Sequence, residues 1–376
     1  MTGDYDAATD HRNVIELSRQ GHNLLKAQRF TEALSVFQKA MALDSKNPYV
    51  LTGMGDLLRH RKDFSGAEHF YLQVLTRDPH NLFALRGLGD SLRGQHRFEE
   101  AIGHWERYLK QNHQTDIFVL TRIADSYKTL DDYEKSLSYY RSALGFRPND
   151  RYALIGLADL YKKHGLDLQA IEQYEKAMAN GVDIVSIFTI AANLYWKHNH
   201  YEKARYYFEK ALQKESGNFH ALYGLGNYYR IMRNHHRAAE LWEQILEHDS
   251  GTVNLLARLG DTYRNIDRLE DAERAYRKGL ERGYDKFTLV GMMKLRCQEG
   301  RLKDACDCYD ELLRNEVEDT HFFVEAGLVL LQYGFSDKVL EFYRHVEQVQ
   351  RDSPAACQVI RECVLQLEKP GPADKA

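Results

Sequence analysis

The stretch FHALYGLGNYYRIMRNHHRAAELWEQILEHDSGT, residues 219–252, decides how this chain folds. Apolar residues recur in it at helical spacing on either side of a polar turn, which predicts two short amphipathic helices. They are Leu222, Leu225, Gly226 and Tyr229 in the first helix, and Ala238, Trp242 and Ile245 in the second. A hairpin this small cannot bury both apolar faces by itself. The same pattern recurs about every 34 residues from Val14 to about Ser353, so we expect each hairpin to pack against its neighbours.

Three places in each unit hold residues of one kind, if the units are numbered from one to thirty-four. Place eight is small: Gly21, Gly55, Gly89, Ala124, Ala158, Ala192, Gly226 and Gly260. Place twenty is also small: Ala33, Ala67, Ala101, Ser136, Ala170, Ala204, Ala238 and Ala272. Place twenty-four is aromatic: Phe37, Tyr71, Trp105, Tyr140, Tyr174, Phe208, Trp242 and Tyr276. A glycine inside a helix costs about 1 kcal/mol relative to alanine, so we expect the helices to approach closely at place eight.

This spacing and these residues resemble the tetratricopeptide repeat family, whose pattern is W-x2-L-G-x2-Y…A-x3-F…P. The resemblance implies an all-α fold, a right-handed superhelical solenoid of about ten helix-turn-helix repeats. It also implies that the first helix of each repeat lines a concave groove.

The repeats divide the chain into five parts. Residues 1–13 are a polar stretch that we expect to be frayed, and residues 14–285 hold eight regular repeats, the third of which is one residue longer than the others. Residues 286–352 hold two degenerate repeats, in which Met293, Arg296 and Val339 replace the usual residues. Residues 353–368 predict a C-terminal capping helix, and residues 369–376 a disordered tail. The alternative is that the degenerate repeats and the last helix form a homodimer surface.

Composition excludes several classes of protein. The 51 basic and 55 acidic residues give a net charge of −4, which provides no overall field for nucleic acid or an anionic membrane. The first residues lack the features of a signal peptide, and no window is apolar enough for a membrane span. The five cysteines are an odd number, which favours reduced thiols and a cytoplasmic location.

The resemblance implies that places two, five, nine, twelve and thirteen face the groove. Place nine holds acids or amides, namely Asp56, Asp90, Asp125, Asp159, Asn193, Asn227 and Asp261. Place twelve holds mostly bases, namely Arg59, Arg93, Lys128, Lys162, Trp196, Arg230 and Arg264. An acid and a base three residues apart can pair along one helix, or the two rows can bind the backbone and charged side chains of an extended peptide. Asn193 and Asn227 can each donate and accept, and Trp196 is a candidate aromatic anchor or a packing residue.

Other known modes of this family are not supported by the sequence. Only Asn193 and Arg258 match the carboxylate clamp that grips acidic C-terminal tails, and place six lacks an asparagine ladder. Cys306 and Cys308 fall on different faces of one helix, and we find no metal-ligand spacing, phosphate loop or nucleophile motif. We therefore expect no cofactor, no metal and no enzymatic activity.

These observations predict a non-enzymatic scaffold or adaptor that binds a protein or an extended peptide in its groove. We expect no nucleic acid or membrane partner. One alternative is a regulatory subunit of a separately encoded enzyme or of a secretion or assembly complex. Another is an RNA-binding α-solenoid, which would need a net basic groove, whereas the acids of place nine nearly cancel the bases of place twelve.

Overall fold

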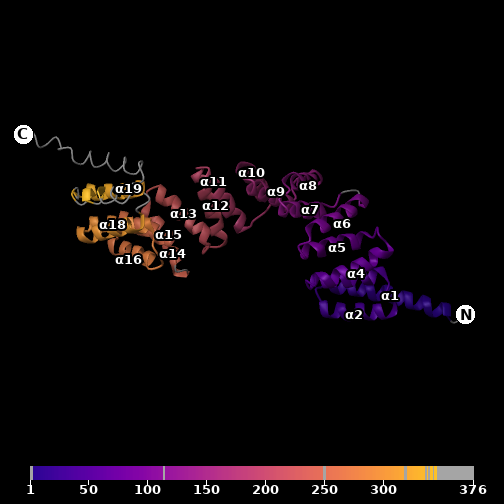
Figure 1. The fold of residues 1–376 in the computed structure, drawn as a ribbon. Helices are drawn as coiled ribbons and strands as arrows, with labels where there is room; N and C mark the ends of the chain where they lie inside the picture. The colour runs from indigo at the N-terminus through magenta and orange to yellow at the C-terminus, as the bar shows by residue number, and fades with distance from the viewer. Residues whose placement is uncertain are drawn as a thin grey trace, which may run out of the picture. The chain divides into compact units, whose positions relative to one another are not determined.

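The computed structural model describes residues 3–112, 115–248, 251–316, 320–334, 337, 339–341, 343 and 344, of which residues 3–12, 248, 313, 316, 320, 321 and 323–325 are described by their backbone alone. Nineteen helices, α1 to α19, have defined bounds among these residues, the described residues from 337 to 344 are also helical, and none of the described residues is in a strand (Figure 1). The chain divides into two compact units, Met1–Asp183 and Ile184–Ala376.

Each unit is a series of helical hairpins. The first unit contains α1 (Gly3–Lys26), α2 (Phe30–Leu43), α3 (Pro48–His60), α4 (Phe64–Arg77), α5 (Leu82–Gly94), α6 (Phe98–Gln111), α7 (Ile117–Thr129), α8 (Tyr133–Phe146), α9 (Arg151–Lys163) and α10 (Asp167–Ala179). The second contains α11 (Val185–Lys197), α12 (Tyr201–Lys214), α13 (Phe219–Ile231), α14 (His235–His248), α15 (Val253–Asn265), α16 (Leu269–Leu280), α17 (Lys286–Gln298), α18 (Leu302–Glu316) and α19 (Thr320–Gln332). Odd-numbered helices are the first of each pair, and each from α1 to α17 packs against the even-numbered helix that follows it. The all-α repeat architecture expected from the sequence is therefore confirmed.

Side-chain caps start most of the first helices. The residue before the helix accepts a hydrogen bond from a backbone N–H of the first turn at Asn47, Asn81, Asp116, Asp150, Asn218, Thr252 and Asp285. Such a cap contributes about 1 kcal/mol. The exception among the first helices from α3 to α17 is α11, which follows Ile184 and has no side-chain cap. These caps explain why the helices begin at the repeat boundaries read from the sequence.

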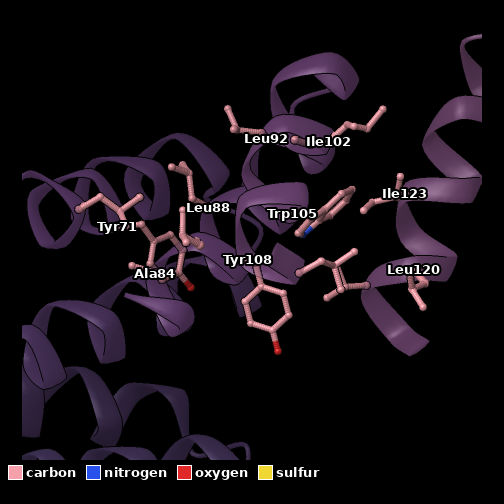
Figure 2. Packing of buried hydrophobic residues seen from close by; sticks show 14 of the residues in the cluster. Tyr71, Ala84, Leu88, Leu92, Ile102, Trp105, Tyr108, Leu120 and Ile123 are labelled. Atoms are coloured by element: carbon pink, nitrogen blue, oxygen red, sulfur yellow. The ribbon is translucent and has the colours of Figure 1, made fainter. Parts of the chain in front are cut away.

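The aromatic residue of place twenty-four lies between two successive first helices. The ring of Tyr71 on α4 is fully buried, and a Cβ on Gly55 of α3 would lie 2.7 Å from its Cε1. A Cβ on Gly87, at place six of α5, would lie 2.6 Å from the same atom. The close approach expected at place eight is thus present, and place six shares it. Figure 2 shows the same core continuing through Trp105, Ile102 and Ile123.

The ends of the chain differ from the regular repeats. Helix α1 begins at Gly3, within residues 1–13 that the sequence predicts to be frayed. The ninth and tenth repeats share one core, in which Met293, Tyr309 and Tyr343 are buried. The capping helix predicted at 353–368, the tail at 369–376 and the last part of the homodimer surface lie outside the described residues.

An ion-pair cluster explains one substitution in the ninth repeat. Arg296, which replaces the usual tyrosine, is buried and lies 2.6 Å from Glu273 and 3.1 Å from Glu299. Hydrogen bonds from Arg296 hold the pKa of Glu273 down at about 2. The arginine thus joins α16 to α17 by charge rather than by ring packing.

Candidate functional site

A hollow on the first unit contains the side chains of the predicted groove places. It has a volume of about 650 Å³ and lies over α1, α3 and α5. It is lined by all five groove places of the second repeat, two, five, nine, twelve and thirteen, which are Tyr49, Thr52, Asp56, Arg59 and His60. The other lining residues are His22, Leu25, Lys26 and Gln28 of the first repeat and Phe83 of the third. The implied groove register therefore describes one real depression in this unit.

The acids of place nine are tied to the core by tyrosine hydroxyls. The hydroxyl of Tyr71 donates to Asp56 at 2.7 Å, and that of Tyr276 donates to Asp261 at 2.7 Å. The equivalent pairs Tyr140–Asp125 and Tyr174–Asp159 make the same bond. Burial raises the pKa of these four phenols, so each remains a donor at neutral pH. One oxygen of each carboxylate is thus committed to holding the two helices of a hairpin together.

The same four acids also pair with the base three residues later. The nitrogen-to-oxygen distances are 3.2 Å for Asp56–Arg59, 3.0 Å for Asp125–Lys128, 3.9 Å for Asp159–Lys162 and 3.8 Å for Asp261–Arg264. The intrahelical pairing considered from the sequence is therefore present in these repeats. The acid side chains are still 35% to 48% exposed, so a ligand can compete for them.

Asp90 departs from this pattern because its repeat has Trp105 in place of a tyrosine. Its carboxylate is only 12% exposed, and it accepts a hydrogen bond at 2.6 Å from Arg122 of the next repeat. Arg59 of the preceding repeat lies 3.5 Å away. Burial raises the pKa of Asp90, and the charge of Arg122 opposes that rise. Arg93, the base of the same repeat, is left exposed.

Asn227 in the second unit also accepts a hydrogen bond from an arginine of the next repeat, where other repeats have a tyrosine hydroxyl as donor. Its repeat has Trp242 at place twenty-four, and its amide oxygen accepts a hydrogen bond at 2.8 Å from Arg258 of the next repeat. Asn227 is 9% exposed, so little of it faces solvent. In both tryptophan repeats, an arginine at place six of the next repeat replaces the missing phenol. This correlation between places twenty-four and six is visible in the sequence, but the sequence reasoning did not use it.

The other two groove candidates of the second unit are more accessible. Asn193 is exposed at the surface of α11. Trp196 is half-buried, with its ring centroid 4.9 Å from that of Tyr201 in an edge-to-face contact. Packing and partial exposure thus coexist at Trp196. Arg230, the base after Asn227, is half-buried, and burial together with the nearby Arg258 lowers its pKa.

A row of exposed aromatic residues at place two was missed in the sequence. Tyr49, Phe83, Phe118 and Tyr152 are 63%, 75%, 48% and 55% exposed. They occupy the same place in four consecutive repeats of the first unit. Listing place two in register would have found them.

Two of the described cysteines have thiols that are poor nucleophiles. Burial raises the pKa of the Cys297 and Cys308 thiols to about 11, which disfavours the nucleophilic thiolate. No group of three or more potential metal ligands occurs among the residues that the structure describes. In that same part of the chain, no helix combines the length and apolarity of a membrane span.

Comparison with known proteins identifies the repeats. One family model described as tetratricopeptide repeat matches residues 18–81 and 191–231, and a second with the same description matches residues 119–150 and 253–282. No curated protein matches the sequence.

Several solved structures share the fold. The C-terminal part of a repeat protein from Cytophaga hutchinsonii is 17% identical with a TM-score of 0.54, covering 64% of this chain and 98% of its own. PilF of Pseudomonas aeruginosa is 16% identical with a TM-score of 0.50, covering 57% of this chain and 96% of its own. PilW, a type IV pilus biogenesis factor, is 14% identical with a TM-score of 0.51, covering 55% of this chain and 96% of its own. At these identities the likeness concerns the fold alone.

Proposed function

Since this chain belongs to the tetratricopeptide repeat family, we propose that it is a non-enzymatic scaffold that binds a partner polypeptide along the faces of its first helices. The observation that carries the proposal is the hollow over α1, α3 and α5. It combines exposed aromatic rings with charged side chains that retain free lone pairs and donors. An extended peptide needs both, because its side chains bury apolar area while its backbone still requires hydrogen-bond partners.

The polar rows have two roles in this proposal. The acids of place nine hold the hairpins together through tyrosine hydroxyls, and their second oxygens remain available to a ligand. Exposed members such as Arg93 and Asn193 contribute recognition. Asn227 contributes through Arg258 instead, since its own amide is buried.

A selection experiment tests the proposal. A library of random displayed peptides is panned against the full chain, and the affinities of the selected peptides are measured for Arg93→Ala, Asn193→Ala and a control, Leu168→Ala. Leu168 is 61% exposed on α10, the second helix of its hairpin. We expect at least one groove variant to weaken binding by about tenfold or more, with the control unchanged. Selected peptides that respond only to Leu168→Ala would place the interface on the second helices and refute the proposal.

A cytoplasmic location belongs to the same proposal. It is supported by the odd number of cysteines. Thiol titration of the protein isolated under alkylating conditions tests it. We expect all five cysteines to react as thiols, and the finding of a native disulfide would contradict the location.

A further inference from the structure

We propose that the aromatic row of the first unit binds an acidic, proline-rich segment in the polyproline II conformation. This inference rests on the proposed function and names the class of its partner. The row begins with Tyr49 on α3 and Phe83 on α5, both of which line the hollow. Phe118 on α7 and Tyr152 on α9 repeat the arrangement two repeats later.

The first reason is exposure without a packing role. Phe83 is 75% exposed and Tyr49 is 63% exposed, and each is the single Phe, Tyr or Trp of its helix. Single exposed apolar residues are ordinary on protein surfaces. Four aromatic residues at one place of four consecutive repeats form instead a periodic surface, and rigid aromatic rings lose little entropy on binding.

The second reason is spacing. Helices α1 and α3 pack against each other, as do α3 and α5, and α7 and α9. Packed helices lie about 8 to 10 Å apart, so the aromatic side chains advance by about that distance from Tyr49 to Phe83 and from Phe118 to Tyr152. Polyproline II has three residues per turn and a rise of 3.1 Å per residue, so equivalent side chains recur about every 9 Å. Within each of these two pairs, one proline per turn therefore meets one aromatic per repeat, as in other aromatic-lined grooves that bind proline-rich segments.

The third reason is the balance of charge and hydrogen-bond donors. Across repeats two to five, places two, five, six, nine, twelve and thirteen hold seven arginines and lysines but only four aspartates. Three of those aspartates already accept a hydrogen bond from a tyrosine hydroxyl, and Asp90 accepts one from Arg122. Arg86 and Lys163 pair with Asp116 and Asp131, which lie just outside these places. Because an arginine or lysine can donate several hydrogen bonds, donors still outnumber acceptors along this face. A proline-rich segment supplies carbonyl acceptors and few N–H donors, and acidic residues between its prolines complement the remaining positive charge.

Fluorescence anisotropy with a labelled peptide of three Pro-Pro-Glu repeats, which extends about 28 Å as polyproline II, tests the inference. A Gly-Ser-Glu peptide of equal length and charge is the matched control for electrostatic attraction. We expect saturable binding of the proline peptide only. Phe83→Ala and Tyr49→Ala should each weaken it by at least about tenfold, while Leu168→Ala leaves it unchanged. Both groove side chains are largely exposed, so these variants should keep the helical circular dichroism spectrum of the parent.

The other outcomes separate this inference from the proposed function. Equal binding of the two peptides would reduce the site to a charge effect and overturn the inference. Failure of the proline peptide, while library-selected peptides or an Ala-Leu-Glu helical peptide bind in a manner sensitive to Phe83→Ala, would overturn the polyproline assignment and leave the scaffold function intact. Failure of every peptide to bind would refute both.

Discussion

Alanine at Gly226 should destabilise the second unit, even though alanine is the better helix former. Gly226 lies inside α13, and a Cβ there would be 2.6 Å from Cδ1 of Trp242 and closer still to two other ring atoms. The indole is fully buried, so the side chains around it must shift if it moves. Gly103 on α6 is the matched control, because it is exposed within a helix and a Cβ there would meet nothing within 4 Å.

The magnitude follows from two opposing terms. Overpacking of a well-packed core costs about 1 to 3 kcal/mol, and the clash at Trp242 lies at the upper end of that range. Replacing glycine by alanine inside a helix returns about 1 kcal/mol. We therefore expect Gly226→Ala to lower the local free energy of unfolding by about 2 kcal/mol, and Gly103→Ala to raise it by about 0.5 to 1 kcal/mol.

The chain itself indicates how the clash can be relieved. Alanine occupies place eight in the repeats that have Tyr140, Tyr174 or Phe208, so a tyrosine repeat can accommodate it, although the repeats of Phe37, Tyr71 and Tyr276 have glycine there, as both tryptophan repeats do. In a Trp242→Tyr background, Gly226→Ala should thus become neutral or slightly stabilising. The double-mutant cycle should give a coupling of about 2 to 3 kcal/mol between the two positions.

Native-state hydrogen exchange measures these energies locally. Solenoids do not always unfold in one step, so protection of the α13 and α14 amides reports the Gly226 variants, and protection of α6 reports the control. If Gly226→Ala stabilises α13 as Gly103→Ala stabilises α6, the close approach of helix and indole is not what constrains place eight. Equal effects of Gly226→Ala with Trp242 and with tyrosine would refute the coupling.

Three further predictions concern the polar contacts. Arg122→Ala should lower the free energy of unfolding in urea by about 1 to 3 kcal/mol, because it removes the hydrogen-bond donor of the mostly buried Asp90 carboxylate and leaves Arg59, at 3.5 Å, as the nearest cation. Adding Asp90→Asn should restore much of that loss. Asp150→Ala should lower the free energy of unfolding by about 1 kcal/mol in the same assay, because the Asp150 side chain caps α9 by accepting hydrogen bonds from two backbone N–H groups. An unchanged free energy of unfolding would show that this cap does not stabilise the start of α9. The pKa of Glu273 is depressed from 4.5 to about 2, so the stability that its carboxylate contributes is complete above pH 4.5 and is lost as the pH falls toward 2. Urea titrations between these pH values should show a steeper loss of the free energy of unfolding for the parent than for Glu273→Gln. Parallel curves for the two proteins would contradict the assignment.

The sequence predicts the repeats well because their signals are local. Asn, Asp or Thr residues cap most of the first helices, and small and aromatic residues mark the contact between paired helices, so boundaries such as Pro48 and Val253 coincide with helix starts. Hydrogen-bond partners are harder to predict, because they depend on residues in the next repeat. Asn227 reads as a groove amide from its place alone, and it becomes a buried acceptor only because Arg258 reaches it from 31 residues away. From the sequence, Arg296 is only a departure from the usual tyrosine, and its hydrogen bond to Glu273 becomes evident in the structure.

These contacts give places nine and two different roles in the groove. A residue at place nine that accepts a hydrogen bond from the core is constrained by the fold, since its loss leaves a buried phenol or guanidinium without a partner. Place two carries no such constraint, because its side chains point away from the hairpin core and are largely exposed. A scaffold built this way keeps its polar row nearly constant while place two is free to vary. Selectivity for a partner should therefore depend more on Tyr49 and Phe83 than on Asp56, whose main bond is internal.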